Sequence, residues 1–103
     1  MLVYGGDIVI IAALSVFPVG VGTSLSKYVK ASVKAVDESG LTCEPGSMAT
    51  TFEAETLDDL FSVVKQAHDA QLKLGAKRVY LVLTIDDRRD KDATMKTKLK
   101  AIS

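Results

Sequence analysis

The order in which two kinds of apolar spacing follow one another constrains the fold of this chain more than any other feature. Four segments are rich in β-branched residues or alternate apolar and polar side chains, as strands do, and two longer segments repeat apolar residues every three or four positions, as helices do. The predicted strands are 8–17, 41–44, 48–53 and 78–86, and the predicted helices are 25–38 and 56–75. The order strand, helix, strand, strand, helix, strand predicts an α+β, ferredoxin-like (βαββαβ) antiparallel sheet with two helices on one face. A further short helix is predicted from about residue 92 to the C-terminus.

Length and charge limit the kinds of protein that this chain can be. Its 103 residues suit a single domain over 1–103, and 13 basic side chains balance 13 acidic ones. A neutral chain lacks the basic excess of a general nucleic-acid or anionic-membrane surface. The apolar stretch 8–21 is shorter than the ~20 residues that span a bilayer, and residues 1–7 have no Lys or Arg to begin a signal peptide. We therefore expect a cytoplasmic protein with no nucleic-acid or membrane partner.

The first predicted strand is apolar on both of its faces. Ile10, Leu14 and Val16 alternate with Ile11 and Phe17, so both faces of the sheet should be covered. Because two helices cover only one face, the second face is expected to meet another subunit. The other residues expected there are Val9, Tyr80 and Val82.

Local signals predict how the helices begin, end and pack. Thr23 or Ser24 is expected to cap the first helix, and Thr56 the second. Gly40 and Gly75 are expected to end them. The predicted apolar stripe of the second helix is Leu57, Leu60, Phe61, Val64, Ala67, His68 and Leu72, and the tail helix is expected to dock through Met95, Leu99 and Ile102.

Few residues suggest catalysis. His68 has no second histidine or cysteine pair with which to share a metal, so it is interpreted as a hydrogen-bonded packing residue, and Cys43 as a small buried hydrophobe. No nucleophile–base pair is recognised, and no metal, cofactor or catalytic residue is predicted. The turn 20–26 joins a strand to a helix and could hold an anion or a polar ring, or could be only a tight turn with a capping hydroxyl.

A dense run of charge follows the last predicted strand. Asp86, Asp87 and Asp90 surround Arg88 and Arg89. Neighbouring opposite charges at a strand end usually form solvated or intersubunit ion pairs, which is the interpretation we favour. The alternative is that the two arginines clamp a phosphate or carboxylate.

Several stretches together resemble the thiamine-binding protein family, the single-domain relatives of YkoF-like proteins. The resemblance extends from about residue 12 to 101. It is carried by 15–20 (SVFPVG), 23–29 (TSLSKYV), 48–50 (MAT) with Glu53, 65–68 (KQAH), 75–80 (GAKRVY) and 85–89 (IDDRR).

The resemblance implies a ferredoxin-like homotetramer, a dimer of dimers, that binds thiamine or its hydroxymethylpyrimidine moiety without catalysis. The site residues that it implies, on the open sheet face, are Thr23, Ser24, Ser26, Met48, Thr50 and Glu53. The hydroxyls would form hydrogen bonds with the pyrimidine, Met48 would form an apolar wall, and Glu53 would face the thiazolium cation. Strict alternation puts Thr50 and Glu53 on opposite faces unless a bulge occurs near Thr51.

Two departures and one alternative accompany this hypothesis. Residues 1–7 are an additional apolar start, and Ala13 stands where members of the family carry an acidic residue, so an affinity that depends on that acid would be lower here. The alternative is a small oligomeric regulatory protein that binds an anion or another metabolite at a subunit interface. It would use the charged segment of Asp86, Arg88 and Arg89.

Overall fold

The computed structural model describes residues 9–103, so the predicted strand residue Ile8 and the additional start at 1–7 lie outside the described residues. Four strands and three helices follow one another in the predicted order. They are β1 (Ile10–Pro18), α1 (Ser26–Glu38), β2 (Cys43–Pro45), β3 (Thr50–Ala54), α2 (Leu57–Lys73), β4 (Val79–Asp86) and α3 (Met95–Ile102).

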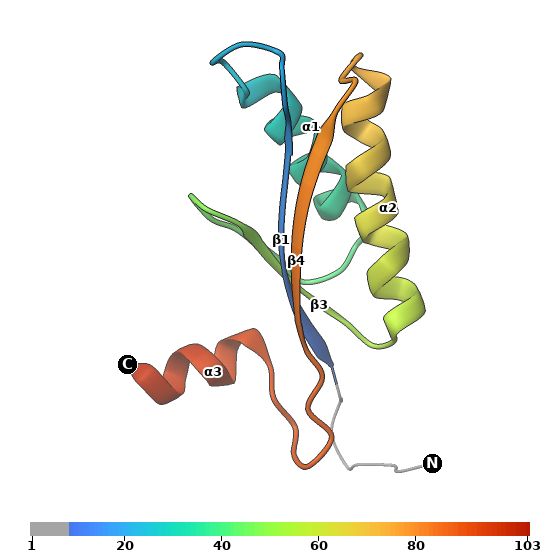
Figure 1. Ribbon diagram of the computed structural model, residues 1–103. Coiled ribbons are helices and arrows are strands. Elements are labelled where there is room, and N and C mark those ends of the chain that lie inside the picture. The colour runs from blue at the N-terminus through green and yellow to red at the C-terminus, as the bar shows by residue number, and fades with distance from the viewer. Residues whose placement is uncertain (1–8) are drawn as a thin grey trace.

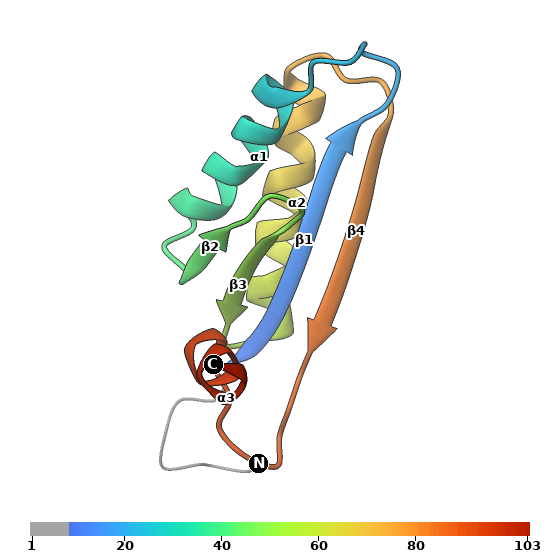
Figure 2. The ribbon, with the colours of Figure 1, turned by 90° about the vertical axis from the view of Figure 1, so that its left-hand side faces the viewer.

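The strands form one antiparallel sheet in the order β2-β3-β1-β4, and this confirms the predicted ferredoxin-like α+β fold. Helices α1 and α2 cover one face of the sheet, whereas α3 lies on the side of the other face (Figures 1 and 2). The two edge strands differ in length, because β2 has three residues and β4 has eight.

Alternation along β1 divides its side chains between the two faces as predicted. Ile10, Leu14 and Val16 are buried against the helices. The whole buried core cluster is Ile10, Ala12, Leu14, Val16, Val36, Phe52, Ala54, Leu60, Val63 and Ala67. On the other face the rings of Phe17 and Tyr80 stack, with centroids 5.2 Å apart.

Strand β1 pairs along more of its length with β4 than with β3. It pairs with β4 from Ile11 to Pro18, but with β3 only from Ile10 to Leu14. Residues 15–18 therefore have a strand neighbour on one side only, which leaves room at the β3 side.

The hairpin turn is longer than predicted on its second side, because it includes Met48 and Ala49, which were expected in a strand. The Gly46 N–H donates a hydrogen bond to the Ala49 carbonyl, 2.9 Å away, which places Met48 in the turn. Strand β3 consequently starts at Thr50, and β2 ends at Pro45.

One predicted helix cap is wrong and one is confirmed. The residue before α1 is Leu25, and no side chain caps this end, so neither Thr23 nor Ser24 has the expected role. Thr56 does cap α2, accepting a hydrogen bond from the Asp59 N–H at 3.1 Å. Gly40 and Gly75 have φ values of 79° and 98° and follow the helices they were expected to end.

The buried stripe of α2 is rotated from the predicted one. Leu60, Val63, Ala67 and Gln71 are its buried residues. Phe61 is 50% exposed, and the predicted stripe members Leu57 and Leu72 are also exposed. The helix therefore carries a polar side chain into the interior.

Helix α3 is held at its first turn and is otherwise exposed. Thr94 and Thr97 form a capping box, which is why the helix begins at Met95 rather than near residue 92. The Met95 N–H donates to Glu53 Oε1 of β3, 2.8 Å away. Leu99 is 62% and Ile102 is 82% exposed, so α3 contacts the rest of this chain through its first turn, and docking of Leu99 and Ile102 at a subunit contact stays a prediction.

Replacing Glu53 tests this attachment. Glu53→Ala removes the acceptor of a charge-assisted hydrogen bond, with an expected loss of about 1 kcal/mol of local stability. Hydrogen exchange of the Met95 amide, measured by NMR, should become roughly fivefold faster. The control is Glu55→Ala, at an exposed position on the same segment. Equal exchange in the two variants would show that Glu53 does not hold α3.

Candidate functional site

Two hollows occur on opposite faces of the sheet. The smaller hollow, about 130 Å³, lies where β1 has no β3 neighbour. It is lined by residues 14–17 of β1, by 46–50 of the turn and the start of β3, and by Val29, Ser32, Val33 and Val36 of α1. The larger hollow, about 450 Å³, is lined by 11–13 of β1, Glu44, Thr51, 84–86 of β4, and Met95, Lys98 and Leu99 of α3.

The smaller hollow combines hydroxyls with an apolar wall. Thr50 is 7% exposed, and no hydrogen bond joins its hydroxyl to another residue within 9–103. Ser32 and Ser47 contribute two further hydroxyl-bearing side chains, and Val29 and Val33 of α1 contribute apolar surface. A concave site with a few convergent polar groups on an apolar lining is typical of small-molecule binding.

The structure separates two residues that the resemblance placed in one site. Thr50 pairs with Leu14 and Glu53 pairs with Ile11 in an uninterrupted register, so no bulge occurs near Thr51. Thr50 therefore faces the helices, and its expected place on the open face is wrong. Glu53 lies on the open face, where its carboxylate accepts the hydrogen bond from the Met95 N–H.

The remaining predicted ligand residues lie at or outside the rim. Met48 lines the smaller hollow and is 85% exposed. Thr23 and Ser24, between β1 and α1, and Ser26, the first residue of α1, are exposed and line neither hollow. The structure thus brings Met48 and Thr50 together and leaves the three hydroxyls of 23–26 apart from them.

Sequence reasoning missed Ser32 as a lining residue, although a signal was present. Ser32 interrupts the apolar stripe of α1 and lies between the buried residues Tyr28 and Val36. A polar residue on an apolar stripe indicates either a buried hydrogen bond or a site, and Ser32 has both features, since its hydroxyl donates to the Ala67 carbonyl at 2.7 Å.

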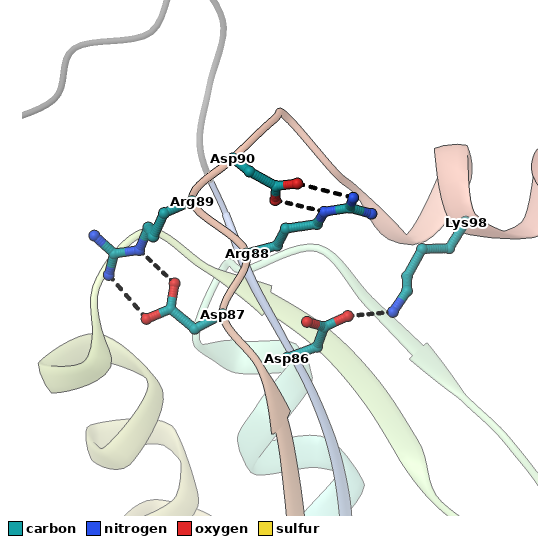
Figure 3. A network of polar contacts seen from close by, with 6 residues as sticks. All are labelled: Asp86, Asp87, Arg88, Arg89, Asp90 and Lys98. Carbon is teal, nitrogen blue, oxygen red and sulfur yellow. Dashed lines mark hydrogen bonds and ion pairs between the residues drawn. The ribbon is translucent and has the colours of Figure 1, made fainter.

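The charged segment after β4 pairs with itself (Figure 3). Two N–H groups of Arg88 donate to Asp90, at 2.6 and 2.9 Å, and Arg89 binds Asp87 in the same two-pronged way. Asp86 binds Lys98 of α3. These hydrogen bonds from arginine hold the pKa values of Asp87 and Asp90 below the ordinary range. The geometry supports the ion-pair interpretation of the segment, since both arginine forks already hold carboxylates.

His68 and Cys43, the two other residues considered in the sequence, make few polar contacts. His68 is half-buried, with Nδ1 3.4 Å from Asp69 Oδ1. Cys43 packs partly against the core, and burial together with Asp37 and Glu44 raises the pKa of its thiol. Within residues 9–103, no three His, Cys, Asp or Glu side chains are grouped as a metal site. None of the helices in this part of the chain is both long and apolar enough to span a membrane.

Fold and hollow together give a small ferredoxin-like α+β chain with a concave hollow that hydroxyl-bearing and apolar side chains line. The model of the thiamine-binding protein family matches residues 12–103, and the chain belongs to this family. A UPF0045 protein of Methanothermobacter thermautotrophicus is 46% identical over 94 residues, which are 90% of this chain and 95% of that protein.

Solved structures agree with the fold. A hypothetical protein from Methanocaldococcus jannaschii has a TM-score of 0.84 and 38% identity, over 91% of this chain and 95% of its own. A Thermotoga maritima protein described as a putative thiamine biosynthesis/salvage protein has a TM-score of 0.76, over 92% of this chain and 99% of its own. At 23% identity, this second likeness concerns the fold alone.

The ion pairs of the charged segment can be tested by titration. A carboxyl whose folded-state pKa is lowered keeps its ion pair until the pH falls through that lowered value, so the Arg88–Asp90 pair should persist at neutral pH and open only in acid. In Arg88→Ala, the Asp90 pKa measured by NMR should rise toward the ordinary value of an aspartate. The melting temperature should change little, because the pair is exposed. An unchanged Asp90 pKa would contradict the pairing.

Proposed function

We propose that this chain is a non-catalytic cytoplasmic protein that binds thiamine through its hydroxymethylpyrimidine moiety and acts as a homo-oligomer. The observation that carries the proposal is the nearly buried, unbonded Thr50 hydroxyl in a hollow with an apolar wall, in a chain of the thiamine-binding protein family. A polar heteroaromatic ring needs both of these features, because its faces are apolar and its edge carries donors and acceptors.

The volume of the smaller hollow decides which part of thiamine it would take. Its 130 Å³ is well below the roughly 300–1,000 Å³ of pockets that enclose drug-sized ligands. One ring fits better than two, so the pyrimidine would enter and the thiazolium cation would stay at the rim near Met48. The exposed hydroxyls of Thr23, Ser24 and Ser26 are proposed as outer contacts, and Glu53 has no place in this arrangement because it lies on the opposite face.

The larger hollow is a weaker candidate for this ligand. Its lining carries the carboxylates of Glu44 and Asp86 beside the Lys98 ammonium group, and its threonines, Thr51 and Thr84, are less buried than Thr50. The anion-binding alternative is weaker too, since Arg88 and Arg89 are engaged by Asp90 and Asp87.

Two edges of the sheet indicate how subunits would meet. Strand β4 is an outer strand of eight residues that contains neither Pro nor Lys, and such an edge tends to pair with another chain. The neighbouring open face leaves Tyr80 51% and Val82 46% exposed. We propose edge pairing through β4, with the open faces packing in turn to give a dimer of dimers.

Adjacent threonines test the ligand site. Thr50→Val keeps the side-chain shape and removes the hydroxyl, which should weaken hydroxymethylpyrimidine binding by about 1 kcal/mol or somewhat more, roughly fivefold to tenfold. The control is Thr51→Val, which faces the larger hollow. Calorimetric titration of both variants should show a loss in Thr50→Val alone. A loss in Thr51→Val alone would move the site to the larger hollow, and a loss in Arg88→Ala alone would favour anion binding.

The oligomeric state tests the proposed assembly. Light scattering at micromolar concentration should give a mass above that of the 11.0 kDa monomer. Val82→Lys places a charge on the open face and should reduce this mass, because burying an unpaired ammonium group is costly. Phe61→Lys, on the exposed side of α2, should leave it unchanged. A monomeric parent protein would refute the assembly.

A further inference from the structure

A buried amide lies behind the smaller hollow and joins its two walls. Gln71 of α2 is completely buried. Its Nε2 donates to the Val16 carbonyl at 2.8 Å and to Ser32 Oγ at 2.9 Å, and the Tyr28 carbonyl is 3.4 Å away. Val16 and Ser32 line the hollow from the strand and from the helix, respectively.

These neighbours determine the orientation of the Gln71 side-chain amide, that is, where its nitrogen and its oxygen lie. Two of the three are backbone carbonyls, which only accept hydrogen bonds, so the amide nitrogen must face them. The amide oxygen, Oε1, then has no partner among the buried groups of residues 9–103. Turning the amide would bring that oxygen against the carbonyls of Val16 and Tyr28.

The orientation of the amide in turn determines which hydrogen bonds the Ser32 hydroxyl donates and which it accepts. Ser32 Oγ must accept from Gln71, and it gives its own proton to the Ala67 carbonyl at 2.7 Å. A hydroxyl has one proton and two acceptor lone pairs, so a single lone pair remains. Thr50 differs, because its unbonded hydroxyl can rotate to donate or to accept.

We infer that Ser32 is a specificity-determining residue of the smaller hollow, where it accepts a hydrogen bond from an amino group on the bound ring. Gln71 is a positioning residue that keeps Ser32 in the accepting state. The inference rests on the proposed function and names the group that distinguishes this ligand from other flat heteroaromatic rings: its amino group. A ring with a carbonyl oxygen at that place is disfavoured, because two acceptors would face each other without a proton between them.

The test uses two ligands that differ in the group at ring position 4. One is 4-amino-5-hydroxymethyl-2-methylpyrimidine, and the other is the corresponding pyrimidin-4-one, which has a carbonyl oxygen in place of the amino group and a proton on a ring nitrogen. In calorimetric titration, the parent protein should prefer the amino ligand by about tenfold or more, the ratio that corresponds to about 1.4 kcal/mol at 25 °C. Ser32→Ala should reduce this preference to near unity.

Variants of the glutamine separate positioning from stability. Gln71→Met keeps a similar volume but frees the Ser32 hydroxyl, so the preference should shrink severalfold while binding persists. Gln66→Met, at an exposed position on the same helix, should leave the preference unchanged. Thr50→Val should weaken both ligands alike, because that hydroxyl adapts to either. If Ser32→Ala fails to fold, Ser32→Cys keeps the size with a much weaker hydrogen-bonding group and makes the same prediction.

The outcomes distinguish the two proposals. If the parent protein binds neither ligand, the proposed function is wrong. If it binds the amino ligand and Ser32→Ala or Ser32→Cys retains the parent preference, the inference about Ser32 is wrong and the function stands. If Ser32→Ala removes the preference for the amino ligand and Gln71→Met leaves it unchanged, the positioning role of Gln71 is refuted.

Discussion

The unequal pairing of β1 with its two neighbours is the constraint on which the rest of the structure depends. β4 follows β1 to Pro18, whereas β3 joins it no further than Leu14. The hairpin turn closes at Gly46 and Ala49, just beyond this point. The second half of β1 is thus open to one side, and α1 packs beside the opening. The smaller hollow exists because β3 is short, and its hydroxyl groups come from the three segments that meet there.

The buried side chain of Gln71, beside this opening, lowers the stability of the fold but also orders the polar groups around it. Gln71 satisfies a strand carbonyl and a helix hydroxyl, yet its own oxygen stays unpaired, and an unmade buried hydrogen bond costs about 1–3 kcal/mol. A leucine at this position would bury no polar atom, but it would leave the Val16 carbonyl and Ser32 without this partner. The glutamine therefore favours a defined polar geometry over the lowest packing energy.

Features that follow from a periodic pattern in the sequence could be predicted, and features that depend on contacts between residues far apart in the sequence could not. The alternation of side chains along β1 allowed its two faces to be predicted. Thr50 and Glu53 are three positions apart in one strand, so alternation already placed them on opposite sides of the sheet. The bond between Glu53 and Met95 joins residues 42 positions apart, and that between Gln71 and Val16 spans 55. Neither has a local signature, so a carboxylate that holds α3 was interpreted as a ligand group. The cap of α1 failed for a related reason, because a hydroxyl near a helix start caps it only if the loop turns the right way.

The difference between the two edges of the sheet has a consequence for how far assembly can go. β2 is three residues long and ends on Pro45, which cannot donate a hydrogen bond to a further strand, whereas β4 presents a long regular edge. A sheet that can grow at one edge alone stops after a second copy has been added, because both long edges are then used in the same twofold contact. The same composition with a long, proline-free β2 would offer a free edge at each end of every pair and would permit endless fibres.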